Sequence, residues 1–442
     1  MAMREATTLL RSSLPSSLIT YYIRASSRSQ LPAPNSLTQS VLYLCTGQNY
    51  QKLSIGGKCS MDMAAFSYSR SFPSLLLLFV ASSISTAAGG FLGVDYGRMM
   101  DNPMPPKDVV KLLQDNGFGA AAIYDADADV VQAFSNSGIK LRVSLPNDEL
   151  ENAARDPNYA NTWVREHVGQ YYPATQIDTI TVGNEVFLQR PELNQYLFPA
   201  MQNVYNALKN LDHADNIKVS TPFAMSALSE SFPPSKGRFR DDLQPIIRQI
   251  LEFLDGIGSF LMVNIYPYIA YRDRYPEISR EYFLGLPNPG VRDDVTGLTY
   301  YSLLDAERDA VFSAVAALGL ASQQQKNDQL SSTLSESGCK SCAIPNMFSK
   351  DETGGAGSTL NSSLAAEPGC SIEDAQAYNS ILVQRIRSGN TGTPLHPNAD
   401  MTVYIFSLFN ENLKPESERS FGLFYPDGRK VYELQATPAG GD

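Results

Sequence analysis

From residue 91 onward, the chain repeats one pattern eight times: a short apolar run followed by a segment with helical spacing. The eight predicted strands are residues 91–96, 120–124, 141–145, 179–182, 219–222, 261–266, 333–335 and 402–408. The predicted helices include 106–116, where Pro106 suits a first turn and Gly117 follows the end, and 162–171. Eight strands alternating with helices over about 350 residues predict a single (β/α)8 TIM barrel of the α/β class.

An open, doubly wound sheet alternates in the same way, but its phosphate-binding loop needs a glycine pattern after the first strand. Gly93 and Gly97 do not complete that pattern. The continuously apolar run 261–263 suits a strand that is covered on both faces. The seventh strand is the weakest prediction, because residues 330–334 are mostly polar. The barrel remains the better interpretation.

The distribution of charge separates a leader from the body of the chain. The whole chain has 35 basic and 46 acidic residues, yet residues 1–60 carry six basic residues and one acid. Residues 61–88 contain the apolar run LLLLFV between Arg70 and the small residues that end at Ala88. That run is too short to span a bilayer, and its flanks are typical of a secretory signal peptide.

The status of residues 1–60 stays open between a transit peptide and an over-extended start, with Met61 or Met63 as the true first residue. In either case, residues 89–442 are expected to form the barrel domain. The signal peptide predicts a secreted protein of the cell wall, with the vacuole as the alternative.

The composition argues against several classes of partner. A net charge of −11 disfavours nucleic acid and anionic membranes, since both favour clustered Lys and Arg. Residues 436–442 are small and polar, so no membrane anchor is predicted. Three histidines and a single Cys-x-x-Cys, Cys339 to Cys342, predict no metal site. Together with Cys370, these cysteines allow one disulfide and one free thiol, in an unspecified pairing.

Carboxylates follow several of the predicted strands, accompanied by Tyr and Asn. The carboxyl ends of barrel strands are where such folds carry chemistry, and tyrosine rings and amides suit sugars. Hydrolysis of a glycosidic bond with retention needs two carboxyl groups, one protonated and one ionised. Glu185 comes shortly after the fourth predicted strand, and Glu336 comes directly after the seventh. We expect the two side chains to face each other across a cleft.

Seven motifs resemble those of the plant β-1,3-glucanases of glycoside hydrolase family 17. They are 93–98 (GVDYGR), 123–127 (IYDAD), 145–150 (LPNDEL), 182–186 (VGNEV), 263–268 (VNIYPY), 409–415 (FNENLKP) and 421–428 (FGLFYPDG). The resemblance runs from about residue 91 to 434. It implies retaining hydrolysis of internal β-1,3-glucosidic bonds in callose, laminarin-like or fungal wall glucan. It also implies a (β/α)8 barrel that works without metal or other cofactor. We separately expect a monomer.

The resemblance also implies roles for individual residues. Glu185 becomes the general acid/base, Asn184 contacts the sugar 2-hydroxyl, and Glu336 becomes the nucleophile. The predicted substrate-binding residues further include Tyr96, Tyr124 and Tyr266 along the sugar subsites, and Glu411 paired with Lys414.

The chain departs from the family just after Glu336. The family continues with Trp-Pro, whereas this chain has Cys339 and Lys340. Residues 347–354 resemble the continuation of the family's loop, which makes Glu352 a rival nucleophile, although no apolar strand precedes it. Two functions therefore stay open beside the leading one: a non-hydrolytic β-glucan-binding wall protein, and a mixed-linkage β-1,3;1,4-glucanase.

Two further departures concern charge. Asp95 stands where the family usually has Asn, and Ala122 stands where it usually has a basic residue. An extra carboxylate and a missing cation both raise the local negative potential. We therefore expect a nucleophile that is harder to ionise.

Overall fold

The computed structural model describes residues 91–320, 332–342 and 367–434, together with four short strands nearer the N-terminus. The chain divides into two compact units, Met1–Ser85 and Thr86–Asp442. In the first unit β1 (Thr7–Leu9) pairs with β2 (Tyr22–Arg24), and β3 (Val41–Thr46) pairs with β4 (Asn49–Ser54). The predicted signal peptide and Glu352 lie outside the described residues.

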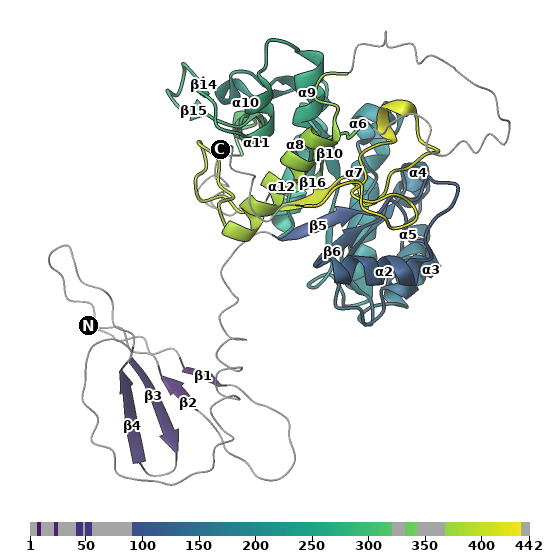
Figure 1. Cartoon of the computed structure of the whole chain (residues 1–442). Coiled ribbons are helices and arrows are strands. Elements are labelled where there is room, and N and C mark those ends of the chain that lie inside the picture. The colour runs from purple at the N-terminus through teal and green to yellow at the C-terminus, as the bar shows by residue number, and fades with distance from the viewer. Residues whose placement is uncertain are drawn as a thin grey trace, which may run out of the picture. The chain divides into compact units, whose positions relative to one another are not determined.

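The second unit is built on a parallel sheet in the order β10-β13-β16-β17-β5-β6-β7-β8-β9 (Figure 1). Its strands are β5 (Leu92–Asp95), β6 (Ala120–Ala122), β7 (Lys140–Leu145), β8 (Gln176–Val182), β9 (Lys218–Ser220), β10 (Pro222–Ala224), β13 (Met262–Asn264), β16 (Ser332–Ser337) and β17 (Met401–Ile405). Only Thr221 separates β9 from β10, so the two ends of this order belong to one stretch of chain. The sheet therefore closes through eight strand positions, which confirms the predicted barrel.

All eight predicted strands are present, and two differ in detail. The fifth is divided at Thr221, so that β9 pairs with β8 while β10 pairs with β13. The polar seventh strand, β16, is hydrogen-bonded on one side to β13 and on the other to β17. Because main-chain hydrogen bonds do not require apolar side chains, two neighbours can hold a strand that its own sequence specifies weakly.

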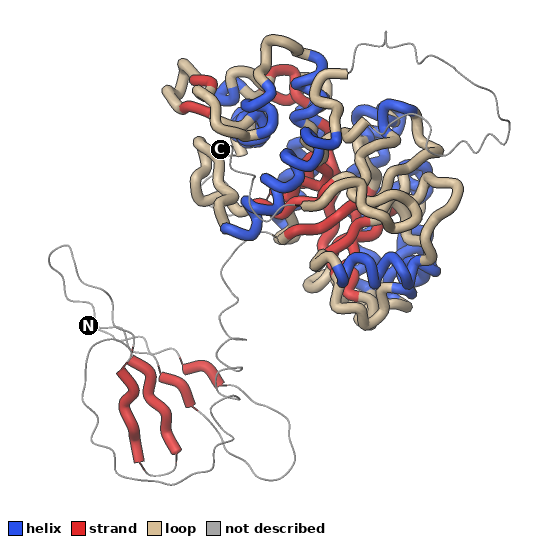
Figure 2. Tube along the Cα trace, viewed as in Figure 1, coloured by secondary structure: helices blue, strands red, loops and turns tan. Residues whose placement is uncertain are grey.

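Helices surround the strands (Figure 2). They are α2 (Pro106–Asp115), α3 (Ala128–Ala133), α4 (Leu150–Arg155), α5 (Pro157–Val164), α6 (Val186–Gln189), α7 (Asn194–Asn210), α8 (Gln244–Gly256), α11 (Leu303–Ala317) and α12 (Ile372–Ser388). The predicted helix 106–116 corresponds to α2, which buries Val109, Val110 and Leu113. The predicted helix 162–171 begins earlier, in α5, and continues as a π-helical turn at Arg165–Gly169.

Two hairpins and two short helices lie against α11 or beside it (Figure 1). They are β11 (Leu228–Glu230) with β12 (Arg238–Phe239), β14 (Val291–Arg292) with β15 (Thr299–Tyr300), α9 (Pro267–Asp273) and α10 (Arg280–Leu284). Within the described part of the chain, no helix is both long and apolar enough to cross a membrane. Cys342 and Cys370 form a disulfide, and Cys339 is a buried free thiol.

Small residues on β5 and β6 make room for a large ring inside the barrel. Tyr404 of β17 is 2% exposed and packs with Ala120 and Ala122. A Cβ atom added at Gly93 would lie 2.5 Å from the Tyr404 ring. Because the ring is enclosed, it has little space to move away.

We therefore expect Gly93→Ala to lower the free energy of unfolding by about 1–3 kcal/mol through overpacking. Gly119→Ala is the matched control, because an added Cβ there meets no atom within 4 Å. Urea unfolding followed by circular dichroism measures both variants. Equal stability of the two would contradict this description of the barrel interior.

Candidate active site

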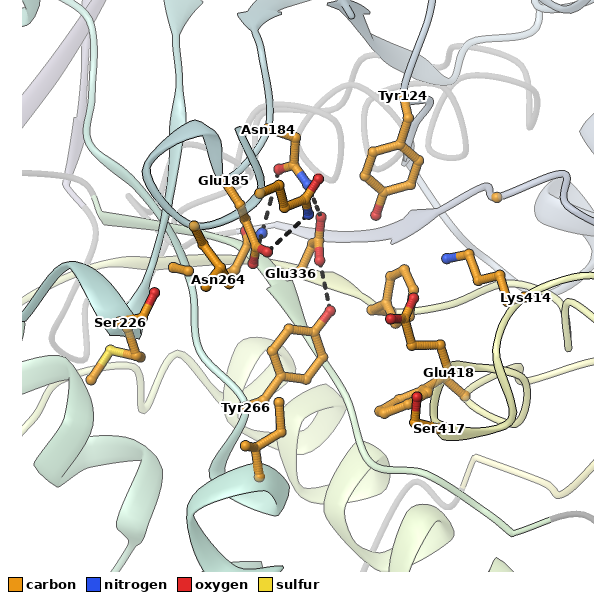
Figure 3. Close-up of a pocket in the computed structure, with 18 of the residues that line it drawn as sticks. Tyr124, Asn184, Glu185, Ser226, Asn264, Tyr266, Glu336, Lys414, Ser417 and Glu418 are labelled. Carbon is orange, nitrogen blue, oxygen red and sulfur yellow. Dashed lines mark hydrogen bonds between the residues drawn. The ribbon is translucent and has the colours of Figure 1, made fainter. Parts of the chain in front are cut away.

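A cleft with a volume of about 1220 Å³ opens at the carboxyl ends of the barrel strands. All eight predicted site residues line it: Tyr96, Tyr124, Asn184, Glu185, Tyr266, Glu336, Glu411 and Lys414. Glu185 and Glu336 lie near the middle (Figure 3). Ser226 lies on one side of this pair, and Ser417 and Glu418 lie on the other. The structure thus brings together residues that are spread over more than 300 positions of sequence.

Glu185 follows β8 through an unusual backbone turn. Gly183 has φ +69, and Glu185 itself has φ 48 in the left-handed region. A non-glycine residue in that region costs about 1 kcal/mol or more, so the surrounding structure must hold it there. The Glu185 amide donates to the Pro222 carbonyl at 3.1 Å, and the Asn184 amide donates to the Asn147 side chain at 2.8 Å. These bonds fix the direction of the Glu185 side chain.

The Glu185 carboxyl group is half-buried and accepts two side-chain hydrogen bonds. Asn264 Nδ2 donates to Oε1 at 2.9 Å, and Gln189 Nε2 donates to Oε2 at 3.1 Å. Burial and then the charge of Glu336 raise the pKa of Glu185 to about 7, while the two amides oppose this rise. A carboxyl group with a pKa near 7 can hold a proton and release it near neutral pH.

Glu336 lies at an irregular point of β16. The register shifts between Val263 and Asn264 on one neighbour, and between Leu334 and Ser337 on the strand itself. Such bulges redirect a side chain and are frequent beside active sites. The Glu336 side chain enters the cleft although the residue is only 6% exposed.

Two donors hold the Glu336 carboxylate. Tyr266 Oη donates to Oε2 at 2.7 Å, and Asn184 Nδ2 donates to Oε1 at 3.2 Å (Figure 3). Tyr124 points toward the same group, and burial followed by the charges of Asp95 and Glu336 raises the Tyr124 pKa. Both glutamates thus accept two side-chain hydrogen bonds, Glu185 from two amides and Glu336 from a hydroxyl and an amide.

Two amides connect the glutamates. Asn264 Nδ2, which contacts Glu185, lies 3.4 Å from Asn184 Oδ1, and the amide nitrogen of Asn184 contacts Glu336. This chain of contacts sets the relative orientation of both carboxyl groups.

Glu411 and Lys414 form the predicted ion pair, with 2.9 Å between Lys414 Nζ and Glu411 Oε2. The other Glu411 oxygen accepts from the Met99 amide at 2.9 Å. A side chain at Gly97 would collide with the Glu411 carboxylate, so glycine is required there. Lys414 also lies over the Phe406 ring at 4.6 Å. The pair therefore joins the loop after β17 to the segment after β5.

Sequence reasoning missed several charged residues at this site, among them Glu418 and Arg142. Glu418 lines the cleft, and its charge contributes to the raised pKa of Glu185. Its loop position among polar residues is typical of a solvated carboxylate, so no sequence pattern distinguished it. Arg142 forms a buried ion pair with Asp95. Residue 122 on β6 is indeed no cation, but Arg142 on the adjacent strand β7 supplies one beside Asp95. That the nucleophile is harder to ionise stays a prediction.

The residues that replace Trp-Pro after Glu336 are packed into the fold. Cys339 is buried, and Lys340 Nζ pairs with Glu367 at 2.7 Å. Cys342, Glu367 and Cys370 are the one group among the described residues with the donors of a metal site. Its two sulfur atoms are joined to each other, so neither is free as a thiolate ligand. The altered segment thus braces the end of β16.

Comparison with known proteins places the whole barrel in one family. The model of Glycosyl hydrolases family 17 matches residues 92–339 and 362–436. "Glucan endo-1,3-beta-glucosidase 11" of Arabidopsis thaliana is 40% identical over 347 residues, covering 78% of this chain and 75% of that protein. "Glucan endo-1,3-beta-glucosidase 7" of the same plant is 37% identical, covering 81% of this chain and 66% of the relative.

A solved structure gives the same result. CJP38, described as a beta-1,3-glucanase and allergen of Cryptomeria japonica pollen, is 39% identical. It aligns with a TM-score of 0.68 over 79% of this chain and 99% of its own. The matched residues include every side chain described above that contacts Glu185 or Glu336. The chain belongs to the glycosyl hydrolases of family 17.

Proposed function

We propose that this glycoside hydrolase cleaves internal β-1,3-glucosidic bonds of β-1,3-glucans and retains the configuration at the anomeric carbon. The observation that carries the proposal is the contrast between two glutamates in one cleft. Burial and the charge of Glu336 raise the pKa of Glu185 to about 7, which suits a group that donates a proton. Glu336 accepts from the Tyr266 hydroxyl and the Asn184 amide at the other carboxyl position of the cleft, which suits the group that attacks the sugar. That division of roles is what a retaining mechanism needs.

In the first step, the Glu336 carboxylate attacks the anomeric carbon while protonated Glu185 donates its proton to the leaving glycosidic oxygen. The bond to the leaving sugar breaks as the ester bond to Glu336 forms. Asn184 donates to Glu336 in the free protein, and we propose that it contacts the sugar 2-hydroxyl when substrate is bound. In the second step, Glu185 accepts a proton from water, and the resulting hydroxide displaces Glu336 from the sugar.

The proposed substrate is a chain that extends past both sides of the reacting bond. Cleft residues flank the glutamates on both sides, and Tyr96, Tyr124 and Tyr266 add rings to the lining. Relatives named as glucan endo-1,3-beta-glucosidases support β-1,3-glucan as substrate, with callose, laminarin-like or fungal wall glucan as sources. We also propose a monomer that is secreted to the cell wall.

Two observations each support an alternative function that the experiments must distinguish from the proposed one. A structural relative that is 32% identical, with a TM-score of 0.64, is described as one of two plant beta-glucan endohydrolases with distinct substrate specificities. Mixed-linkage β-1,3;1,4-glucan is therefore the alternative substrate. The replacement of Trp-Pro by Cys339 and Lys340 motivates a non-hydrolytic glucan-binding protein as the alternative activity.

We expect the purified protein to release reducing sugar from laminarin faster than from mixed-linkage glucan. Glu185→Gln and Glu336→Gln should each lower kcat by about a thousand-fold or more, because each removes a reacting group. Glu151→Gln, on the exposed face of α4, is the matched control and should keep full activity. Laminarin binding without turnover would favour the binding protein, and faster cleavage of mixed-linkage glucan would favour the alternative substrate.

The pKa of Glu185 predicts the alkaline side of the pH profile. The acid must be protonated, so kcat/KM should fall as pH rises through about 7. Asn264→Ala and Gln189→Ala each remove a donor that stabilises the ionised form, so both should move this fall to higher pH. Gln376→Ala on α12 should leave it in place. A shift to lower pH in the first two variants would contradict the assignment.

The stereochemistry of the product gives a separate test. Proton NMR during the first minutes of laminarin-oligosaccharide hydrolysis should show the β-anomer first, with the α-anomer appearing later by mutarotation. Initial release of the α-anomer would mean that water attacks directly, and Glu336 would then be a general base.

A further inference from the structure

A buried guanidinium crosses the interior of the barrel next to Glu336. Arg142 extends from β7 and is 3% exposed. Its Nη2 donates to Asp95 Oδ1 at 2.8 Å and to the Ser335 carbonyl oxygen at 3.0 Å. Strands β7 and β16 are not neighbours in the sheet, so this contact spans the barrel. One nitrogen atom thus connects a carboxylate of the first strand to the backbone immediately before Glu336.

The barrel interior is shaped around this guanidinium. Ala122 is the register partner of Arg142 on the adjacent strand, and its small side chain leaves space beside the long one. The Arg142 guanidinium carbon lies 4.1 Å from the centre of the Tyr404 ring. The ring favours a cation at its face, so packing and charge both hold Arg142 in this position.

The Arg142 guanidinium also offsets negative charge close to the Glu336 carboxylate. Asp95 is fully buried, and this burial raises its pKa well above the usual range of a carboxyl group. The charge of Arg142 opposes this rise, and the charge of Glu336 adds to it. Without Arg142, Asp95 would be a buried acid with no cation in contact, close enough to Glu336 for their charges to interact. Removing one partner from a buried ion pair is costly, because the remaining charge stays desolvated.

We propose that Arg142 is a positioning residue for hydrolysis, which holds the backbone before Glu336 and offsets the negative charge of Asp95 during attack on the sugar. The inference rests on the proposed function of Glu336. It assigns the cation of this site to the third barrel strand, where the sequence alone gave no reason to place one.

The charged and titratable groups around Glu336 come from the strands and loops on every side of it. They are Asp95 from β5, Tyr124 after β6, Arg142 from β7, Glu185 after β8, Tyr266 after β13, and Glu411 and Lys414 after β17. Arg142 and Lys414 are the two cations of this set. Of these, Arg142 is the one bonded to the β16 backbone.

The test compares Arg142→Met, Asp95→Asn and the double variant, each with laminarin across a range of pH. On the acidic side of the pH profile, kcat/KM should fall as Glu336 becomes protonated. Loss of the Arg142 cation should move this fall to higher pH, and loss of the Asp95 charge should move it to lower pH. Each shift should be at least about half a pH unit, and the double variant should return toward the wild-type profile. Arg142→Met should also lower kcat by about ten-fold or more, because Ser335 loses its donor.

A role confined to stability predicts a different result. All three variants would then lose activity or thermal stability, and the acidic fall would stay where it is in the wild-type protein. That outcome would overturn the inference. If Arg142→Met fails to fold, the comparison of Asp95→Asn with the double variant decides the question. Asp95→Asn removes one negative charge, whereas the double variant leaves the net charge unchanged, so the fall of kcat/KM on the acidic side should still lie at lower pH in Asp95→Asn than in the double variant.

A second readout separates this inference from the proposed function. An epoxybutyl β-laminaribioside can esterify Glu336 without any glycosidic bond being cleaved, and mass spectrometry measures the rate at each pH. If the wild-type protein fails to hydrolyse laminarin, the proposed function fails. The labelling rates must still show the opposite shifts in Arg142→Met and Asp95→Asn. Unshifted rates, or no labelling of wild-type Glu336 at any pH, would overturn the inference itself.

Discussion

The placement of β16 between β13 and β17 is the constraint on which the active site depends. This strand carries Glu336, and its hydrogen-bonded neighbours carry the residues that surround it. Asn264 and Tyr266 come from the end of β13, and Glu411 with Lys414 from the loop after β17. Because the sequence of β16 is polar, its position comes from pairing on both sides rather than from an apolar pattern. Closure of the barrel supplies both partners.

The chemistry depends on holding like charges close together in different environments. Glu185, Glu336, Glu411 and Glu418 all line one cleft, and Asp95 is buried beside it. Three of them are balanced in different ways: Lys414 pairs with Glu411, Arg142 pairs with Asp95, and hydroxyl and amide donors hold Glu336. Glu185 has amide partners, and its burial, followed by the charge of Glu336, raises its pKa. The two glutamates that we propose as acid and nucleophile thus differ in their neighbours.

Much of the barrel could be predicted, because apolar runs and helical spacing report burial directly. The division of the fifth strand at Thr221 could not be predicted, because residues 219–222 form one continuous strand-like run in the sequence. The break arises because the two halves pair with two different neighbours, β8 and β13. The sequence signal for the seventh strand was weak because this strand is held by its hydrogen-bonded neighbours rather than specified by its own side chains. The disulfide between Cys342 and Cys370 was likewise one of several pairings that the sequence allowed.

At the site, motif resemblance located residues that spacing alone would have left scattered. Arg142 was missed because an Arg between Leu141 and Val143 gives no sign that it points into the barrel. Its partners, Asp95 and Ser335, lie 47 and 193 positions away, and only the closed sheet brings them together. The resemblance to the family also led to an incomplete inference at Ala122. Because the family usually has a basic residue there, its absence suggested that this part of the site has no cation. In this chain Arg142, the register partner of Ala122 on the adjacent strand, supplies a cation beside Asp95.

The central claim is that Glu336 forms a covalent bond to the sugar, and trapping that bond tests it most directly. A 2-deoxy-2-fluoro-β-laminaribiosyl fluoride slows both steps and has a good leaving group, so the ester to the nucleophile should accumulate. After proteolysis, mass spectrometry should find the fluorosugar on the peptide that contains Glu336, and Glu336→Ala should abolish it. A label on Glu352, or steady turnover of laminarin with no trapped ester, would contradict the account.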